Sequence, residues 1–165
     1  MSSPPTLYLV CGKIAAGKST LARSLAMRPA TLLISEDHWM SNLFLDELKT
    51  IDDYRRCSAR LRNAMGPHVV AILQAGLSVV LDFPANTKGN RTWMRALIAP
   101  PHAACQLHVL DVPDAVCKQR LRARNASGGH PFKASDEDYD LFTRYFDPPT
   151  PDEGFDVVVH DFNDA

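Results

Sequence analysis

Short apolar runs alternate with longer stretches in which apolar residues recur every three or four positions. The runs are rich in Leu, Val and Ile, and each is bounded by turn-forming or charged residues, as expected for buried strands. Strands that alternate with helices predict an α/β fold with a parallel sheet covered by helices on both faces. The predicted strands are 7–11, 31–34, 77–82, 106–111 and 156–160.

The longest predicted helix covers 53–74, where Leu61, Met65, Val69 and Ile72 fall on one face. Because proline lacks an N–H and crowds the preceding turn, Gly66-Pro67 predicts a kink or a break in this helix. The region that follows Ser35-Glu36-Asp37, up to residue 52, is polar and mixed, and no element is assigned to it. Three further helices are expected: one capped by Asn86 or Thr87, one with Pro113 in its first turn and running to about Asn125, and one that begins with a capping box at Ser135.

Composition restricts the class of protein. The chain has 165 residues, 45% hydrophobic and 22% charged, with a net charge of −1. This size suits one domain over 1–165. The near-neutral charge argues against nucleic acid as a partner, and no apolar run is long enough to span a membrane. The first residues lack the regions of a signal peptide, so a cytoplasmic protein is expected.

The cysteines and histidines do not predict a metal centre. No C-x-x-C pair or H-x-x-x-H pair occurs in the sequence. Cys11 falls in a predicted buried strand and Cys105 directly precedes another, so reduced core thiols are expected. The cysteines are Cys11, Cys57, Cys105 and Cys117.

The most specific motif lies between the first predicted strand, 7–11, and a further helix that is predicted directly after the motif. It matches G-x-x-x-x-G-K-[ST] at every fixed position. Glycines let the backbone N–H groups turn toward an anion, and the helix N-terminus adds its positive dipole. We therefore expect the loop to bind ATP, with Lys18 at the phosphates and Ser19 on Mg²⁺. The residues of this loop are Gly12, Lys13, Ile14, Ala15, Ala16, Gly17, Lys18, Ser19 and Thr20.

Two acids follow neighbouring strands. Asp82 ends the run Val-Val-Leu-Asp and is interpreted as a second Mg²⁺ residue, with a capping acid as the alternative. Asp37 follows the second strand, where a carboxylate could orient an acceptor hydroxyl and take its proton. Ser35-Glu36-Asp37 could equally be a helix start with Ser35 as its cap, and both interpretations of Asp37 can hold together.

Two groups of arginines are candidates for anion binding. Arg120 and Arg124 are four residues apart on one predicted helix face, directly before a Gly-rich segment that predicts a lid over about 122–136. They could offset charge on a transferring phosphoryl group, or form a solvated basic face. A second group favours a solvated helix face, and its contact with an acceptor stays open; it comprises Arg55, Arg56, Arg60 and Arg62.

Taken together, these motifs resemble the small P-loop kinases of the AAA_33 / zeta-toxin-like group, which in turn resembles chloramphenicol phosphotransferase and the kinase half of polynucleotide kinase. The resemblance covers nearly the whole chain. It implies a three-layer fold with strand order 2-3-1-4-5, an acceptor-activating acid at Asp37, and lid arginines at Arg120 and Arg124. Polynucleotide kinases commonly place an arginine soon after that acid, whereas His38-Trp39-Met40 stands here.

The leading hypothesis is therefore an ATP-dependent phosphotransferase that acts on the hydroxyl of a small-molecule acceptor. A nucleic-acid 5′-end kinase is a second hypothesis, disfavoured by the net charge. A nucleotide-dependent ATPase or switch that works through a partner protein is a third, because no motif identifies an acceptor.

Overall fold

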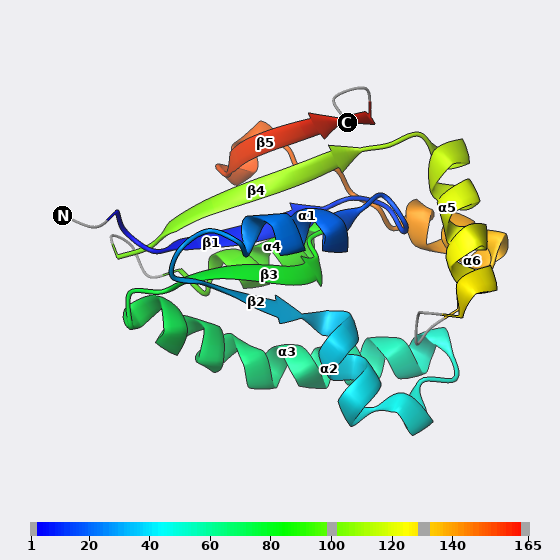
Figure 1. Ribbon diagram of the computed structural model, residues 1–165, viewed down its shortest axis with the longest axis horizontal. Helices are drawn as coiled ribbons and strands as arrows, with labels where there is room; N and C mark the ends of the chain where they lie inside the picture. The colour runs from blue at the N-terminus through cyan, green and yellow to red at the C-terminus, as the bar shows by residue number, and fades with distance from the viewer. Residues whose placement is uncertain (1–2, 99–101, 129–132, 163–165) are drawn as a thin grey trace.

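A five-stranded parallel sheet forms the centre of the protein (Figure 1). The computed structural model describes residues 3–98, 102–128 and 133–162. The strand order is β2-β3-β1-β4-β5, as the resemblance implied. All five strands fall where the apolar runs predicted them, and they are β1 Thr6–Cys11, β2 Thr31–Ser35, β3 Ser78–Pro84, β4 Ala104–Asp111 and β5 Asp156–Asp161.

Helices pack on both faces of this sheet. On β1, Tyr8 and Val10 face α1 (Lys18–Leu25), where they form a cluster with Ala22 and Leu25. Alternate residues of β1 face the opposite side, where α3 (Ile51–Gln74) and α4 (Lys88–Arg95) complete the larger core cluster. Because successive side chains of a strand point to opposite faces, burial of both faces explains the unbroken apolar character of β1.

Two helices lie beyond the carboxyl ends of the strands rather than over the sheet (Figure 1). These are α5 (Asp114–Ser127) and α6 (Asp136–Arg144), which pack together through Cys117, Leu121 and Tyr139. Ala16 of the glycine-rich loop belongs to the same cluster. The helices thus lie directly against the loop that the sequence marks for phosphate binding.

Of the kink or break predicted at Gly66-Pro67, the break is wrong, because α3 continues through Pro67 to Gln74. One face of the helix buries Leu61, Met65 and Val69 in the core. Proline removes one hydrogen bond from the helix. The burial of apolar side chains before and after Pro67 offsets this loss, so the helix continues. A capping box at Thr50 fixes its first turn.

The region after Ser35-Glu36-Asp37, to which the sequence assigns no element, contains most of α2 (Glu36–Leu43) and a 3₁₀ turn at Leu45–Glu47. Ser35 caps α2, since its side chain accepts a hydrogen bond from the His38 N–H at 3.3 Å. Thr87, rather than Asn86, caps α4. The cap that the sequence left open at Ser35 is therefore present, with Asp37 in the first helical turn.

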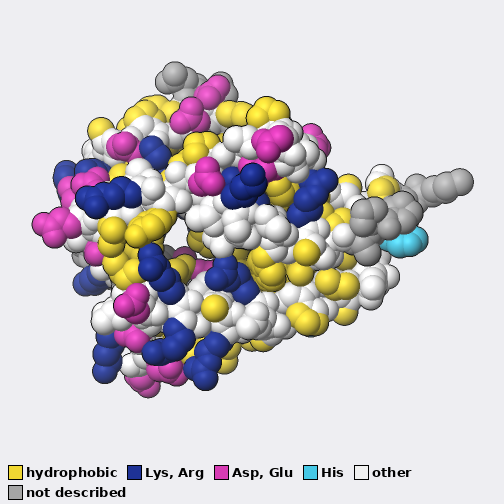
Figure 2. All heavy atoms as spheres, turned by 180° about the vertical axis from the view of Figure 1, so that it is seen from behind, with side chains coloured by type: hydrophobic (Ala, Val, Ile, Leu, Met, Phe, Trp, Pro, Cys, Tyr) yellow, Lys and Arg dark blue, Asp and Glu magenta, His cyan; other side chains and the backbone are white. Residues whose placement is uncertain are grey.

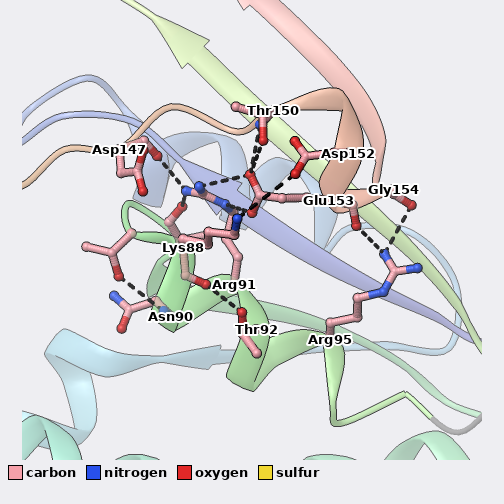
Figure 3. A network of polar contacts seen from close by, with 12 residues as sticks. Lys88, Asn90, Arg91, Thr92, Arg95, Asp147, Thr150, Asp152, Glu153 and Gly154 are labelled. Atoms are coloured by element: carbon pink, nitrogen blue, oxygen red, sulfur yellow. Dashed lines mark hydrogen bonds and ion pairs between the residues drawn. The ribbon is translucent and has the colours of Figure 1, made fainter.

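A buried ion pair joins α4 to the segment before β5 (Figure 3). The Arg91 guanidinium donates to both carboxylate oxygens of Glu153, at 2.7 and 3.1 Å. It also donates to the carbonyl oxygens of Ala85 and Asp147, at 3.0 and 2.7 Å. These bonds hold the loop after β3 in place, and that loop borders the candidate site.

The described cysteines are all free thiols, and three of the four are buried. Within the described ranges, no helix combines the length and the apolar character that a membrane crossing requires.

Candidate functional site

The loop Gly12–Thr20 connects β1 to α1 at the carboxyl edge of the sheet. Gly17 has a φ of +105°, a conformation that favours glycine, and Ala15 has a φ of +60°. Gly12 matters for space, because a Cβ there would lie 3.2 Å from the Leu110 Cβ. The two fixed glycines of the motif are therefore needed for different reasons: Gly17 for its backbone conformation and Gly12 for the close approach of Leu110.

Lys18 turns back over this loop. Its ammonium group donates to the carbonyl oxygens of Gly12 and Lys13, at 2.6 and 2.8 Å. Burial lowers the pKa of Lys18, and the carboxylates of Asp82 and Asp37 oppose that change. The ammonium group is thus held at the centre of the loop, within electrostatic reach of both acids.

Ser19 and Asp82, the two residues that the sequence predicts to hold Mg²⁺, lie side by side. The Ser19 hydroxyl donates to Asp82 Oδ2 at 2.8 Å. Burial raises the pKa of Asp82, and the bond from Ser19 acts in the opposite direction. A hydroxyl and a single carboxylate fit Mg²⁺, which prefers oxygen ligands and commonly takes the remainder from water and phosphates. The described residues contain no cluster of three or more His, Cys, Asp or Glu that could hold a metal by itself.

Asn86 fixes the start of the loop from the other side. Its side-chain oxygen accepts from the Gly12 N–H at 2.9 Å, and its side-chain amide donates to the Gly12 carbonyl oxygen at 2.8 Å. The Asp147 N–H in turn donates to the Asn86 carbonyl oxygen at 2.8 Å. Asn86 was predicted only as a cap; its pairing with a residue 74 positions earlier leaves no local signal in the sequence.

Glu36 and Asp37 begin α2 at the opposite wall. Glu36 is buried, and its carboxylate accepts hydrogen bonds from the Tyr54 hydroxyl and, at 3.2 Å, from Ser58 Oγ. Burial raises the pKa of Glu36 to about 7. The half-buried Asp37 faces the cavity and acts electrostatically on Lys18. The structure therefore separates the two adjacent acids into one packed on α3 and one beside the phosphate loop.

Arg120 and Arg124 both reach the cavity from α5. Arg120 donates to the Ala16 carbonyl oxygen at 3.3 Å. Burial lowers the pKa of Arg124, an effect that Asp37 opposes. The Arg124 Nε is buried and has no hydrogen-bond partner in the described part of the chain. A buried donor without a partner is costly and is a natural position for a ligand oxygen.

The predicted lid of about 122–136 is described only at its two ends, because residues 129–132 lie outside the described ranges. At its base, the Asn125 side chain donates to the Ala134 carbonyl oxygen at 2.6 Å, and Arg122 pairs with Asp136. These contacts join the end of α5 to the start of α6.

The second basic group divides in two. Arg56 and Arg60 point away from the cavity and pair with Glu47, at 3.4 and 3.9 Å. Arg55 and Arg62 line the cavity instead. The four arginines therefore do not share one face, because successive residues of a helix point to different sides.

All these side chains border one cavity of about 1550 Å³. Figure 2 shows the molecule hollowed on this side, with Lys and Arg side chains gathered around the opening. Aromatic residues from α6 and its C-terminal end close one side of the cavity; they are Phe142, Tyr145 and Phe146. The sequence did not predict them as site residues, because their helical spacing is equally typical of a core face.

A phosphate loop after the first strand of a 2-3-1-4-5 parallel sheet defines the P-loop kinase-like fold. A family model described as an AAA domain, AAA_33, matches residues 7–149, and the chain belongs to this family. The resemblance found in the sequence is therefore confirmed. No curated protein has a sequence that matches this chain.

Solved structures share the fold over nearly the full length of the chain. A candidate kinase from Chloroflexus aurantiacus is 25% identical, with a TM-score of 0.78 over 96% of this chain and 89% of that one. A sugar kinase from Janibacter is 21% identical, with a TM-score of 0.70 over 97% and 87%. Kti12 from Chaetomium thermophilum, solved with ADP-AlF3, is 15% identical, with a TM-score of 0.73 over 96% and 90%.

Proposed function

We propose that the protein is an ATP-dependent phosphotransferase that transfers the γ-phosphoryl group to a hydroxyl of a small molecule. The observation that carries the proposal is the position of Asp37 in the same cavity as the phosphate loop, within electrostatic reach of Lys18 and Arg124. A carboxylate beside the loop can orient an acceptor hydroxyl and take its proton. Nucleotide binding alone does not require such a carboxylate. The similarity in fold to a sugar kinase supports this class of reaction.

In the proposed reaction, the backbone N–H groups of the loop and Lys18 hold the phosphates of ATP. Ser19 and Asp82 would hold Mg²⁺, which supplies charge neutralisation between the phosphates. The buried Arg124 Nε donates to an oxygen of the transferring group. Arg120, already anchored on the Ala16 carbonyl, adds positive charge from the same helix face.

The chemical step is one displacement. Asp37 accepts a hydrogen bond from the acceptor hydroxyl and takes its proton as the new bond from that oxygen to the γ-phosphorus forms. The bond between the γ-phosphorus and the β–γ bridging oxygen breaks, and its electron pair leaves with ADP. The aromatic residues at the end of α6 restrict water, which would otherwise compete with the acceptor.

The test pairs nucleotide binding with transfer in Asp37→Asn. Asparagine keeps the size of the side chain and loses the base, so acceptor-dependent ADP release should fall by about 10²-fold or more while ATP affinity measured by calorimetry stays the same. Asp52→Asn is the matched control, because Asp52 is the second residue of α3 as Asp37 is of α2, and it is exposed outside the cavity.

The outcomes separate the hypotheses. Intact nucleotide binding with lost transfer supports the proposal. Near-normal transfer in Asp37→Asn contradicts the role of Asp37. Slow ATP hydrolysis that no hydroxyl compound stimulates would instead favour a switch that acts through a partner.

A further inference from the structure

The helix α3 presents two arginines to the acceptor side of the cavity. Arg55 and Arg62 line it, together with Tyr54 and Ser58 from the same helix. Residues four apart lie on one helix face, so Tyr54, Ser58 and Arg62 form a row, with Arg55 at its edge. Arg55 and Arg62 are separated by about 10 Å along the helix axis.

Neither arginine is neutralised by a carboxylate. No ion pair reaches Arg55 or Arg62 among residues 3–98, 102–128 and 133–162, whereas Arg56 and Arg60 on the outer side of α3 both pair with Glu47. Arg62 donates to the neutral Asn90 side chain and lies over the Trp93 ring. Arg55 lies over the Tyr145 ring, 5.3 Å from its centre. Both guanidinium groups are therefore oriented by neutral partners, and their positive charge is available to bind an anion.

Glu36 lies within electrostatic reach of Arg62 but is engaged by other donors. Its carboxylate oxygens accept hydrogen bonds from Tyr54 and Ser58. Burial raises the pKa of Glu36 to about 7, so a substantial part of it is protonated at neutral pH. Arg62 therefore remains available to an anion from outside the chain.

The same contacts place the arginines near the reacting group. Glu36 binds α3 at Tyr54 and Ser58, so the first turn of α2 lies against the stretch of α3 between Arg55 and Arg62. Asp37 is the next residue in that turn. Along the helix axis, Ser58 is about 4.5 Å from Arg55 and about 6 Å from Arg62.

We propose that the phosphoryl acceptor is a hydroxylated small molecule that carries an oxyanion, a carboxylate or a phosphate ester, which Arg55 and Arg62 bind while Asp37 receives the hydroxyl. This inference rests on the proposed function. Arginine suits the role because its planar guanidinium group matches both anions with paired hydrogen bonds.

The test compares compounds that differ only in the anionic group. Glycerate, glycerol 3-phosphate and glycerol form a three-carbon series, and galactonate, galactitol 1-phosphate and galactitol form a six-carbon series. Binding is measured by calorimetry with the loop filled by the Mg²⁺ complex of a non-hydrolysable ATP analogue, and transfer is measured as ADP release with Mg·ATP. The two anionic members distinguish a carboxylate from a phosphate ester.

The variants are Arg62→Gln and Arg55→Gln, with Arg60→Gln as the matched control on the outer side of α3. An anionic member of a series should bind the wild-type protein more tightly than the neutral member. Each cavity variant should weaken that binding, and raise the KM of transfer, by about 10- to 100-fold, the usual effect of losing a charge-assisted hydrogen bond. Arg60→Gln should match the wild type, and circular dichroism checks that all variants are folded.

The inference is overturned if neutral members bind or react as well as anionic ones, if no anionic member binds, or if folded Arg55→Gln and Arg62→Gln bind anions as the wild type does. Its failure differs from that of the proposed function. Binding of anions that depends on both arginines, without any ADP release, supports the anion site and contradicts transfer. Transfer to neutral acceptors at a rate that neither arginine substitution changes supports the proposed function and contradicts the anion site.

Discussion

The Ser19 hydroxyl donates a hydrogen bond to Asp82 Oδ2 at 2.8 Å, although 63 positions separate the two residues. Ser19 lies in the first turn of α1 and Asp82 lies on β3, the strand that pairs with β1. The parallel register of β1 and β3 therefore brings together the hydroxyl and the carboxylate that fit Mg²⁺.

Asp82→Asn should raise the Mg²⁺ concentration needed for half-maximal ATP-dependent activity by about 10-fold or more, because the neutral amide holds a cation or its water less strongly. A Mg²⁺ titration at fixed ATP measures this. Asp111→Asn is the control, since Asp111 is an exposed acid that ends β4, on the other side of β1 from β3. Identical titrations for Asp82→Asn and the wild type would contradict the assignment.

Gly12→Ala should weaken nucleotide binding and destabilise the protein by about 1–3 kcal/mol, the usual cost of overpacking. The new Cβ would lie 3.2 Å from the Leu110 Cβ and 3.3 Å from the Ala16 Cβ, so the loop must move. Urea unfolding and calorimetry with ATP measure the two effects.

Gly89→Ala is the glycine control for this experiment. Gly89 lies in α4, and the nearest atom to an added Cβ is the Thr87 hydroxyl oxygen, at 4.0 Å. Alanine there should be neutral or stabilising by up to about 1 kcal/mol. Equal stability of Gly12→Ala and the wild type would show that the loop has room for a side chain.

Glu36 should make stability depend on pH between about 4.5 and 7. Its pKa is about 7 in the folded protein against 4.5 for an ordinary glutamate, so the folded state binds the proton more tightly. The contribution of Glu36 is therefore complete below pH 4.5 and is lost as the pH rises through 7. Relative to Glu36→Gln, the wild type should lose on the order of 3 kcal/mol of unfolding free energy over this range.

Urea unfolding of both proteins at several pH values measures that difference, and the change at other titrating groups cancels in it. Glu47→Gln is the control, because Glu47 is exposed beside Arg56 and no burial acts on it. A difference between Glu36→Gln and the wild type that stays constant with pH would contradict the raised pKa.

Glu153→Gln should destabilise the protein by about 3–5 kcal/mol, because it leaves the Arg91 charge buried without a counter-charge. The Arg91 side chain is 1% exposed and the Glu153 side chain 7%. Chemical unfolding at pH 7 checks this. Asp152→Asn should have almost no effect, since its contact with Lys88 is exposed and 4.0 Å long. A loss below about 1 kcal/mol for Glu153→Gln would contradict the role of this pair.

The sequence by itself determined the parts of the protein that depend on neighbouring residues. The five strands follow from local apolar runs, and the caps at Ser35 and Ser135 follow from side chains within three positions of the backbone they bind. The loop from Gly12 to Thr20 is equally local, because one strand, one turn and one helix create its shape.

Only the tertiary structure decided which side chains face the site. Asn86 pairs with Gly12 across 74 positions, and Glu36 bonds to α3 while Asp37 acts on Lys18 of the phosphate loop. The four arginines of α3 look alike in sequence, yet the packing of α3 on the sheet directs Arg55 and Arg62 inward. Such choices depend on the rotation of a helix against its neighbours, and that rotation is fixed by contacts between residues far apart in the chain.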